Sequence, residues 1–380
     1  MNKISLKRRN RDILRSLKFR KGRTYLLRKR NIEAKRELLD RNNQTILDYL
    51  QSKVLAGVNL YIDGKMRVRL TLPKVMNLSS EYENTVNHML LLRKIAEYNK
   101  KGNNSVKLAG VDFNELTNIS TSAALLLTAE LSRWDDSNRS RIVPKIETWQ
   151  PNIIIKFWEL GFFELFQNIK PSEHGITAKP KIRLVKYIKG RIKENDYRRL
   201  KSNLRELIGA DIDQWMFLHS GLDEAITNVT HHAYPSNCKI EERDQNWYLT
   251  GAFNTDTKEL KVVFLDQGIG IPNSLPASKM YEKVLDWLKK FPISERKLHK
   301  KLLEAAVSVE RTQTAEEDRG NGIPDMLEFI KQRKEGYISI FSQHGLFKLT
   351  IDAVTGKEVI KTESFKAPIC GTLIIWKVQL

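Results

Sequence analysis

Cysteine is the scarcest feature of this 380-residue sequence: there are only two, Cys238 and Cys370, far apart along the chain. Their separation fits no metal-binding spacing, which argues against a cysteine-based metal site. We interpret them as buried thiols of a protein in a reducing compartment.

Long apolar runs are missing as well. No stretch is long and apolar enough to span a bilayer, so we expect no membrane association. The N-terminus is basic but no apolar run follows it, which argues against a signal peptide. We therefore expect a soluble, cytoplasmic protein, and its length predicts two or more domains.

Acidic residues are outnumbered by basic ones, which gives a net charge of +20 and a pI near 9.7. Such a charge attracts polyanions without specifying which. The imbalance is greatest in residues 1–36, a basic N-terminal arm. It is interpreted as an electrostatic arm for nucleic acid, as a solvated tail, or, since Leu14, Leu17 and Tyr25 interrupt the charges, as a helix that packs on a partner.

The next two segments differ in pattern. Residues 37–105 are predicted to be mostly helical around one hairpin, because Asp63-Gly64 separates two alternating apolar stretches. Residues 106–170 are predicted as strand, helix, strand and helix, with the second strand over RIVPKIETW. Ser120, Thr121 and Ser122 begin the first of these helices, where hydroxyl side chains usually serve as helix caps.

A second basic segment, residues 171–200, begins with Pro and Gly as linkers do. Its interleaved apolar residues favour an edge strand and a first helix of the C-terminal domain, residues 201–380.

The stretch Gly221 to Tyr234 predicts one amphipathic helix, because apolar residues recur at three- and four-residue steps. Glu224, Asn228 and His232 are four residues apart and therefore share a face. A carboxylate can accept a proton from water, and an amide oxygen is a hard ligand suited to Mg²⁺. The alternative is a solvated polar face without chemistry.

Glycine motifs follow this helix. In KVVFLDQGIGIP an apolar strand ends at Asp266, and Gly268 and Gly270 force a turn. In DRGNGIPDMLEFI, Gly320 and Gly322 precede a helical pattern, whose first N–H groups can bind phosphate. Near the C-terminus, Gly371 and Thr372 open the predicted strand GTLIIWKV.

Together these stretches resemble the GHKL ATPase superfamily, which includes gyrase, MutL and histidine kinases. They are most similar to the serine kinases that act as bacterial anti-sigma factors. The matching patterns are EAxxNxxxHAY from Glu224 to Tyr234, DxGxGIP from Asp266 to Pro272, RGxGI from Arg319 to Ile323, and the terminal GT at Gly371 and Thr372. The resemblance covers roughly residues 200–380. It implies a Bergerat-type α/β sandwich with a mixed sheet, helices on one face and an ATP pocket.

The resemblance also implies roles for single residues. Asn228 would hold Mg²⁺, and Glu224 would be the base or the group that orients water. Asp266 would accept a hydrogen bond from the adenine amino group, with Thr372 beside it. Several further residues would surround the phosphates or the pocket edge: Gly268, Gly270, Arg319, Gly320, Gly322 and His232. For His232 a simple position at the pocket edge is an equal alternative.

Residues 106–170 resemble a STAS-type domain, the fold of anti-sigma factor antagonists, although the D-S-G around the antagonist serine is missing. The resemblance implies a phosphoacceptor serine at the start of the first helix of this segment, so Ser120, Thr121 or Ser122 would be the alternative acceptor, with kinase and substrate-like domain in one chain. The fold class we predict is α+β: a Bergerat-type domain at the C-terminus, preceded by a smaller STAS-like α/β domain and a basic helical arm.

The function predicted from this resemblance depends on ATP and Mg²⁺. If water attacks the γ-phosphate, the protein is an ATPase that switches conformation; if a serine or threonine of a partner protein attacks, it is a kinase. A long helical segment, Asn273 to Asp318, is predicted to close over the nucleotide. The alternative is a nucleotide-sensing module that binds nucleic acid through its arm. A homodimer is compatible with the superfamily.

Overall fold

The computed structural model describes residues 44–100, 106–134, 139, 146–166, 180–191, 198–213, 215–278, 280–313, 322–333, 335–352 and 354–380. The basic arm, residues 1–36, lies outside this part of the chain, and so do Arg319 and Gly320. The described residues combine helices and strands, so the chain is an α+β protein.

The upstream half begins with a helix over residues 44–55 and then forms small sheets with helices beside them. Its strands are β1 (Leu60–Ile62), β2 (Arg67–Thr71), β3 (Val75–Met76), β4 (Lys107–Asp112) and β5 (Asn118–Ile119). Its helices are α2 (Tyr82–Lys100), α3 (Thr121–Ser132), η1 (Ile146–Thr148), α5 (Pro151–Leu160) and η2 (Phe162–Leu165). β1 pairs antiparallel with β2 across the Asp63-Gly64 turn, which confirms the predicted hairpin.

The downstream half is built on a six-stranded sheet in the order β10-β11-β9-β8-β6, with β7 also paired to β8. Its strands are β6 (Ile182–Leu184), β7 (Ile188–Arg191), β8 (Asn246–Asn254), β9 (Glu259–Asp266), β10 (Gly336–Ile351) and β11 (Glu358–Gln379). Every neighbouring pair in this sheet is antiparallel, so the mixed sheet implied by the resemblance is wrong. β6 and β7 form its edge, as predicted for the second basic segment.

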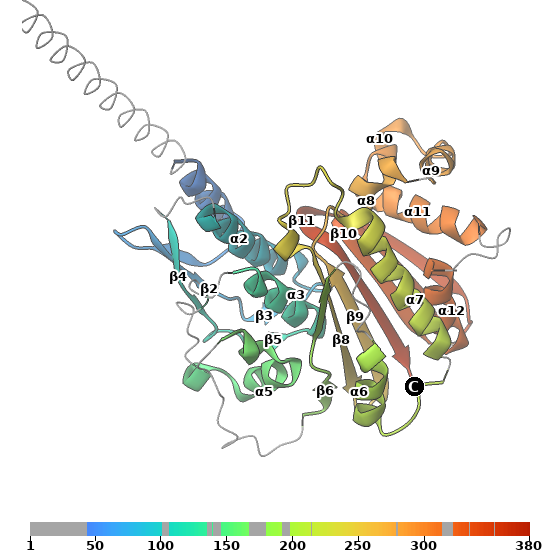
Figure 1. The fold of residues 1–380 in the computed structure, drawn as a ribbon, viewed down its shortest axis with the longest axis horizontal. Helices are drawn as coiled ribbons and strands as arrows, with labels where there is room; N and C mark the ends of the chain where they lie inside the picture. The colour runs from blue at the N-terminus through green and yellow to red at the C-terminus, as the bar shows by residue number, and fades with distance from the viewer. Residues whose placement is uncertain are drawn as a thin grey trace, which may run out of the picture.

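Helices of the downstream half follow in two groups. Those that pack along the sheet are α6 (Arg198–Ile208), α7 (Trp215–Asn228), η3 (Val229–Ala233) and α12 (Gly322–Gln332). A short 3₁₀ turn, η4 (Glu242–Asp244), precedes β8. Those between the two glycine motifs are α8 (Ile271–Ser274), η5 (Leu275–Ala277), α9 (Tyr281–Leu288), α10 (Ile293–Arg296) and α11 (His299–Gln313). Figure 1 shows the second group at one end of the sheet, and we call it the lid.

Both faces of the six-stranded sheet are covered (Figure 1). Side chains alternate between faces along each strand. On β9, Phe264 packs in the core beneath α7 and α12, whereas Leu265 packs in a second core with α2 and α3 of the upstream half. The helices that the resemblance places on one face are therefore joined by a second helical layer on the other.

Three predicted elements need correction. Ile146–Thr148, within the predicted strand RIVPKIETW, is a 3₁₀ turn that leads into α5, where Pro151 occupies the first turn. The strand predicted to open at Gly371 is part of β11, which begins at Glu358. The helix predicted from Gly221 already includes Trp215.

The predicted absence of membrane spans can be checked against the same residues. Within the described ranges, no helix has both the length and the apolar character needed to cross a bilayer.

Candidate nucleotide site

A cavity of about 630 Å³ lies on the α7 side of the sheet, beneath the lid. Its size is typical of pockets that bind small organic ligands. Six residues singled out in the sequence line it, although they come from distant parts of the chain: Glu224, Asn228, His232, Asp266, Gly270 and Thr372. Three of the four sequence motifs therefore converge on one cavity.

The wall formed by α7 carries the polar side chains predicted to do chemistry. Asn228 donates a hydrogen bond through its amide nitrogen to Glu224 Oε1 at 3.1 Å. That orientation leaves the amide oxygen of Asn228 as an acceptor or ligand. Burial raises the pKa of Glu224, against smaller lowering effects of the Asn228 hydrogen bond and the charge of His231. A raised pKa suits a carboxylate that accepts a proton during catalysis.

The continuous α-helix predicted over this stretch is wrong in its last turn. Val229–Ala233 is wound as a π-helix, a feature that recurs at functional sites. His231 and His232 lie in this turn and both line the cavity. Burial, and then the charge of His231, lowers the pKa of His232, which favours a neutral ring at physiological pH.

The floor of the cavity is formed where β9 ends beside β11. Asp266 is 4% exposed, and Thr372 lies directly opposite it in the strand pairing. The N–H of Gly268 donates to Asp266 Oδ1 at 2.8 Å. Burial raises the pKa of Asp266 to about 6, although hydrogen bonds from Gly268 and Thr372 work in the opposite direction. A buried carboxylate at a cavity floor favours a ligand that donates a hydrogen bond to it.

Two glycines allow the floor to form. A Cβ at Gly268 would overlap the backbone of Ala233, at the end of the π-turn. The next residue, Ile269, donates its N–H to the Ala233 carbonyl at 2.9 Å, so the loop lies directly against that turn. Gly371 has a φ of 85°, and a Cβ there would overlap the carbonyl of Asp266. Close backbone contact explains both glycines.

Sequence reasoning missed Ser342 and Gln343, which hold this loop from β10. Ser342 Oγ accepts from the Ile271 N–H and donates to the Gly371 carbonyl, both at 2.9 Å. Gln343 donates through its side-chain nitrogen to the Ile269 carbonyl at 2.8 Å. The pairing of β10 with β11 shifts register between these two residues, so that both side chains point toward the loop. The one indication in the sequence was that Ser342 is a polar residue among the apolar residues that β10 contributes to the core beneath α7.

Apolar side chains form the rest of the cavity and were not predicted individually. They come from the sheet and from α11: Phe264, Ile340, Ile374, Leu303 and Val307. Such walls fit the flat, apolar faces of an aromatic ring.

The lid has a small core of its own, in which α9 packs against α11. Some of its lysines are engaged locally: Lys290 lies 3.6 Å from the ring centre of Trp287, and Lys301 pairs with Glu304 at 2.9 Å. These lysines contribute to the lid's own packing. Most residues of the lid that face the cavity, such as Met280 and Ala306, are apolar, and Ser274 and Ser278 are the polar ones among the described residues.

The structure describes only part of the predicted RGxGI motif. Arg319 and Gly320 lie outside the described residues. Gly322 is the first described residue of α12, which packs against α7.

The described residues include no group of three or more His, Cys, Asp or Glu side chains that could bind a metal. The side chains of Glu224 and Asn228 nevertheless contact each other on one wall, and both carry oxygen atoms. Magnesium commonly takes one or two protein oxygens and completes its shell with phosphate and water, so this donor set fits Mg²⁺ held together with a nucleotide.

The serine-rich start of α3 lies in the upstream half. Ser120 is the N-cap of α3 and accepts from the Ala123 N–H at 3.2 Å, which confirms the capping interpretation for this residue. Thr121 and Ser122 are buried. α3 itself packs against β8 and β9, and its buried side chains share a core with the sheet face turned away from the cavity.

Comparison of the chain with protein-family models, curated proteins and solved structures finds no match.

Proposed function

We propose that the chain binds Mg–ATP in this cavity, in a Bergerat-type site, and transfers the γ-phosphoryl group to an acceptor oxygen. The observation that carries the proposal is the convergence of Glu224, Asn228, Asp266 and Thr372 on one cavity of about 630 Å³. These residues come from three separated motifs: one would serve the phosphates, and the other two would bind the base.

The floor would bind the adenine ring. Asp266 would accept a hydrogen bond from the exocyclic amino group, with Thr372 beside it. The aromatic ring would then lie between apolar side chains such as Phe264 and Ile374. A base that presents a carbonyl oxygen at this position would meet a carboxylate and be rejected.

The wall would serve the phosphates. Asn228 would hold Mg²⁺, which supplies charge compensation for the phosphate oxygens when it is bound. Glu224 would accept the proton of the attacking hydroxyl as the new P–O bond forms and the bond to ADP breaks. With water the products are ADP and phosphate; with a serine or threonine hydroxyl they are ADP and a phosphoester.

The test is incubation of purified protein with γ-labelled ATP and Mg²⁺, with label followed as free phosphate and on protein. Glu224→Gln should lower turnover by about 10²–10⁴-fold and leave nucleotide binding intact, because it removes only the proton acceptor. Asn228→Ala should weaken Mg–ATP binding.

The matched control is Glu206→Gln, a substitution of the same type at an exposed position of α6. Turnover and binding should both be unchanged in this variant. Wild-type turnover and binding that persist in Glu224→Gln and in Asn228→Ala would show that the site is wrongly assigned.

A further inference from the structure

Asp266 and Gln267 are consecutive residues that serve opposite sides of the sheet. Asp266 lines the cavity, whereas the side chain of Gln267, which is 0% exposed, extends to α3 of the upstream half. Its amide nitrogen donates to Glu130 Oε1 at 3.0 Å. The alternation of side chains between the two faces of the sheet, which β9 shows along its length, thus continues one residue beyond the strand.

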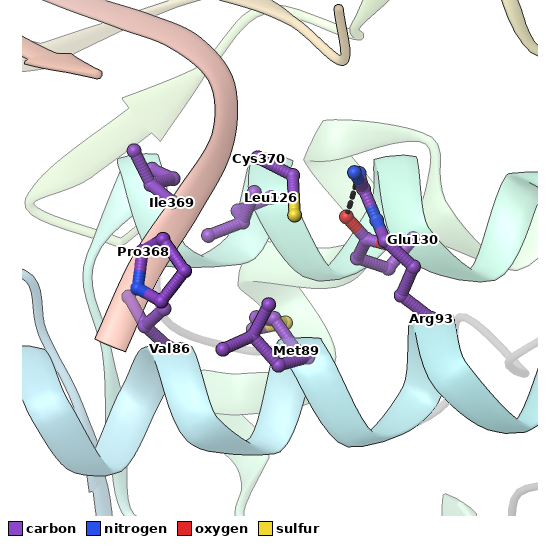
Figure 2. A pocket seen from close by; sticks show the side chains of 9 residues that line it. Val86, Met89, Arg93, Leu126, Glu130, Pro368, Ile369 and Cys370 are labelled. Atoms are coloured by element: carbon purple, nitrogen blue, oxygen red, sulfur yellow. Dashed lines mark hydrogen bonds and ion pairs between the residues drawn. The ribbon is translucent and has the colours of Figure 1, made fainter. Parts of the chain in front are cut away.

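Glu130 is itself fixed in place. It is 2% exposed, and Arg93 of α2 donates to both of its oxygens, through Nε at 3.0 Å and Nη2 at 2.5 Å. Figure 2 shows the arginine reaching across from α2 to α3 beside Cys370 of β11. Because a guanidinium binds a carboxylate in a rigid two-point geometry, the oxygen that Gln267 contacts has a defined position.

The loop is held on its other side by the end of the π-turn. The backbone N–H of Gln267 donates to Tyr234 Oη at 3.1 Å, and Tyr234 donates to the Asn246 carbonyl at 2.8 Å. Gln267 is therefore held from both sides, immediately before the Gly268 N–H that binds Asp266.

Packing alone does not account for an amide here. The side-chain oxygen of Gln267 is buried and has no hydrogen-bond partner among the described residues. An aliphatic side chain would fill the same space without an unpaired polar atom. The hydrogen bond to Glu130 is the interaction that an aliphatic residue could not supply.

We propose that Glu130, oriented by Arg93, is a positioning residue for the nucleotide site: through Gln267 it holds the Asp266–Gly268 turn in the shape that binds the base. This inference rests on the proposed function. The upstream helical layer is then part of the nucleotide site without touching the cavity. By linkage, nucleotide binding must also tighten the contact between α3 and the loop.

The experiment compares three variants of the full chain. Gln267→Met removes the link and leaves the Arg93–Glu130 pair intact. The double variant Arg93→Met/Glu130→Met removes the acceptor and both charges together, so that no unpaired charge stays buried. Ser132→Ala is the matched control, because it removes the 2.5 Å contact between Ser132 Oγ and Tyr248 Oη in the same layer and leaves the hydrogen bonds among Arg93, Glu130 and Gln267 in place.

The Kd for Mg–ATP is measured by calorimetry, and the Tm is measured in parallel. We expect Gln267→Met and the double variant to raise the Kd by about tenfold, within the usual range of coupling between sites. Ser132→Ala should lower the Tm and leave the Kd within about twofold of wild type. A Kd that is unchanged in both link variants overturns the proposal, as does an equal rise in Ser132→Ala.

Hydrogen exchange of the Gly268 and Ile269 amides, without nucleotide, separates this inference from the proposed function. Faster exchange in the double variant than in Ser132→Ala supports the positioning role. Equal exchange in these two variants refutes it. If wild-type protein binds no Mg–ATP, the proposed function fails, and the exchange rates still decide whether Glu130 holds the loop.

Discussion

The two faces of the six-stranded sheet are built from alternate residues of the same strands, yet the carboxylates buried on them differ in how far their charge is compensated. On the face toward α2 and α3, the Glu130 carboxylate is paired with Arg93 and Gln267. On the face toward α7, the Asp266 carboxylate lies at the floor of an open cavity, and its pKa is raised to about 6 by burial.

This difference in compensation means that ionising the buried carboxylate costs more free energy at Asp266 than at Glu130. A buried charge that is paired and hydrogen-bonded adds rigidity, whereas one that lacks compensation is costly to ionise. On the face toward α2 and α3, a void of about 10 Å³ lies beside the Arg93–Glu130 pair. The open face keeps a carboxylate whose ionisation is incompletely compensated, which is the state expected of a group that awaits a ligand.

The largest effect is expected where the strands themselves meet, at Gly371. Gly371→Ala should destabilise the protein by about 3 kcal/mol or more, because the new Cβ would overlap the Asp266 carbonyl and φ is 85°. Urea unfolding measures the change. Gly64→Ala is the control, since that glycine has open space around it and should change stability little. Equal effects at both positions would contradict the close packing described here.

A gain in stability is expected at Asp266. Its folded pKa of about 6 exceeds the ordinary value of 3.8, so its favourable contribution is present below pH 3.8 and is lost as pH rises through about 6. Asp266→Asn removes this loss and should stabilise the protein by about 1–3 kcal/mol at pH 7.5, with little change near pH 4. The same variant should lose nucleotide binding, because an amide nitrogen replaces an acceptor.

The control for this prediction is Asp256→Asn. Asp256 is exposed, and its pKa is lowered by a hydrogen bond from Lys181, so the sign is opposite and no gain at pH 7.5 is expected. Urea unfolding of both variants at pH 4 and pH 7.5 is the measurement. A stability difference for Asp266→Asn that does not depend on pH would refute the assigned pKa.

The sequence was most informative where function requires particular residues at short spacings. Glu224 and Asn228 are four residues apart on α7, so their contact follows from helix geometry alone. The position of Asp266 at a strand end follows from the apolar run before it and the glycines after it. Thr372 opposite Asp266 came from the resemblance, since pairing of distant strands has no local signal.

Sequence patterns could not indicate the contacts between elements that are far apart along the chain. Gln267 and Glu130 are 137 residues apart, and α3 is buried along most of its length, so no apolar stripe marks the side that meets the sheet. The π-turn at Val229–Ala233 has a similar cause, because the sequence periodicity there is that of an α-helix. Its winding accompanies the contact of Ala233 with Ile269, which is a tertiary interaction.

The smallest effect should come from Ser342, whose hydroxyl connects Ile271, in the loop after β9, with Gly371 of β11. Ser342→Ala leaves the Ile271 N–H and the Gly371 carbonyl without this partner, at a cost of about 1 kcal/mol in stability. Nucleotide affinity should fall several-fold as well, because Ile271 lines the cavity. Ser339→Ala, on the same strand and equally buried, removes a hydroxyl of the alternate set, whose side chains face α2 and α3, and should leave affinity unchanged. If Ser339→Ala weakened nucleotide binding as much as Ser342→Ala, the two faces would not differ in the way proposed, and the hydroxyl of Ser342 would have only a general packing role.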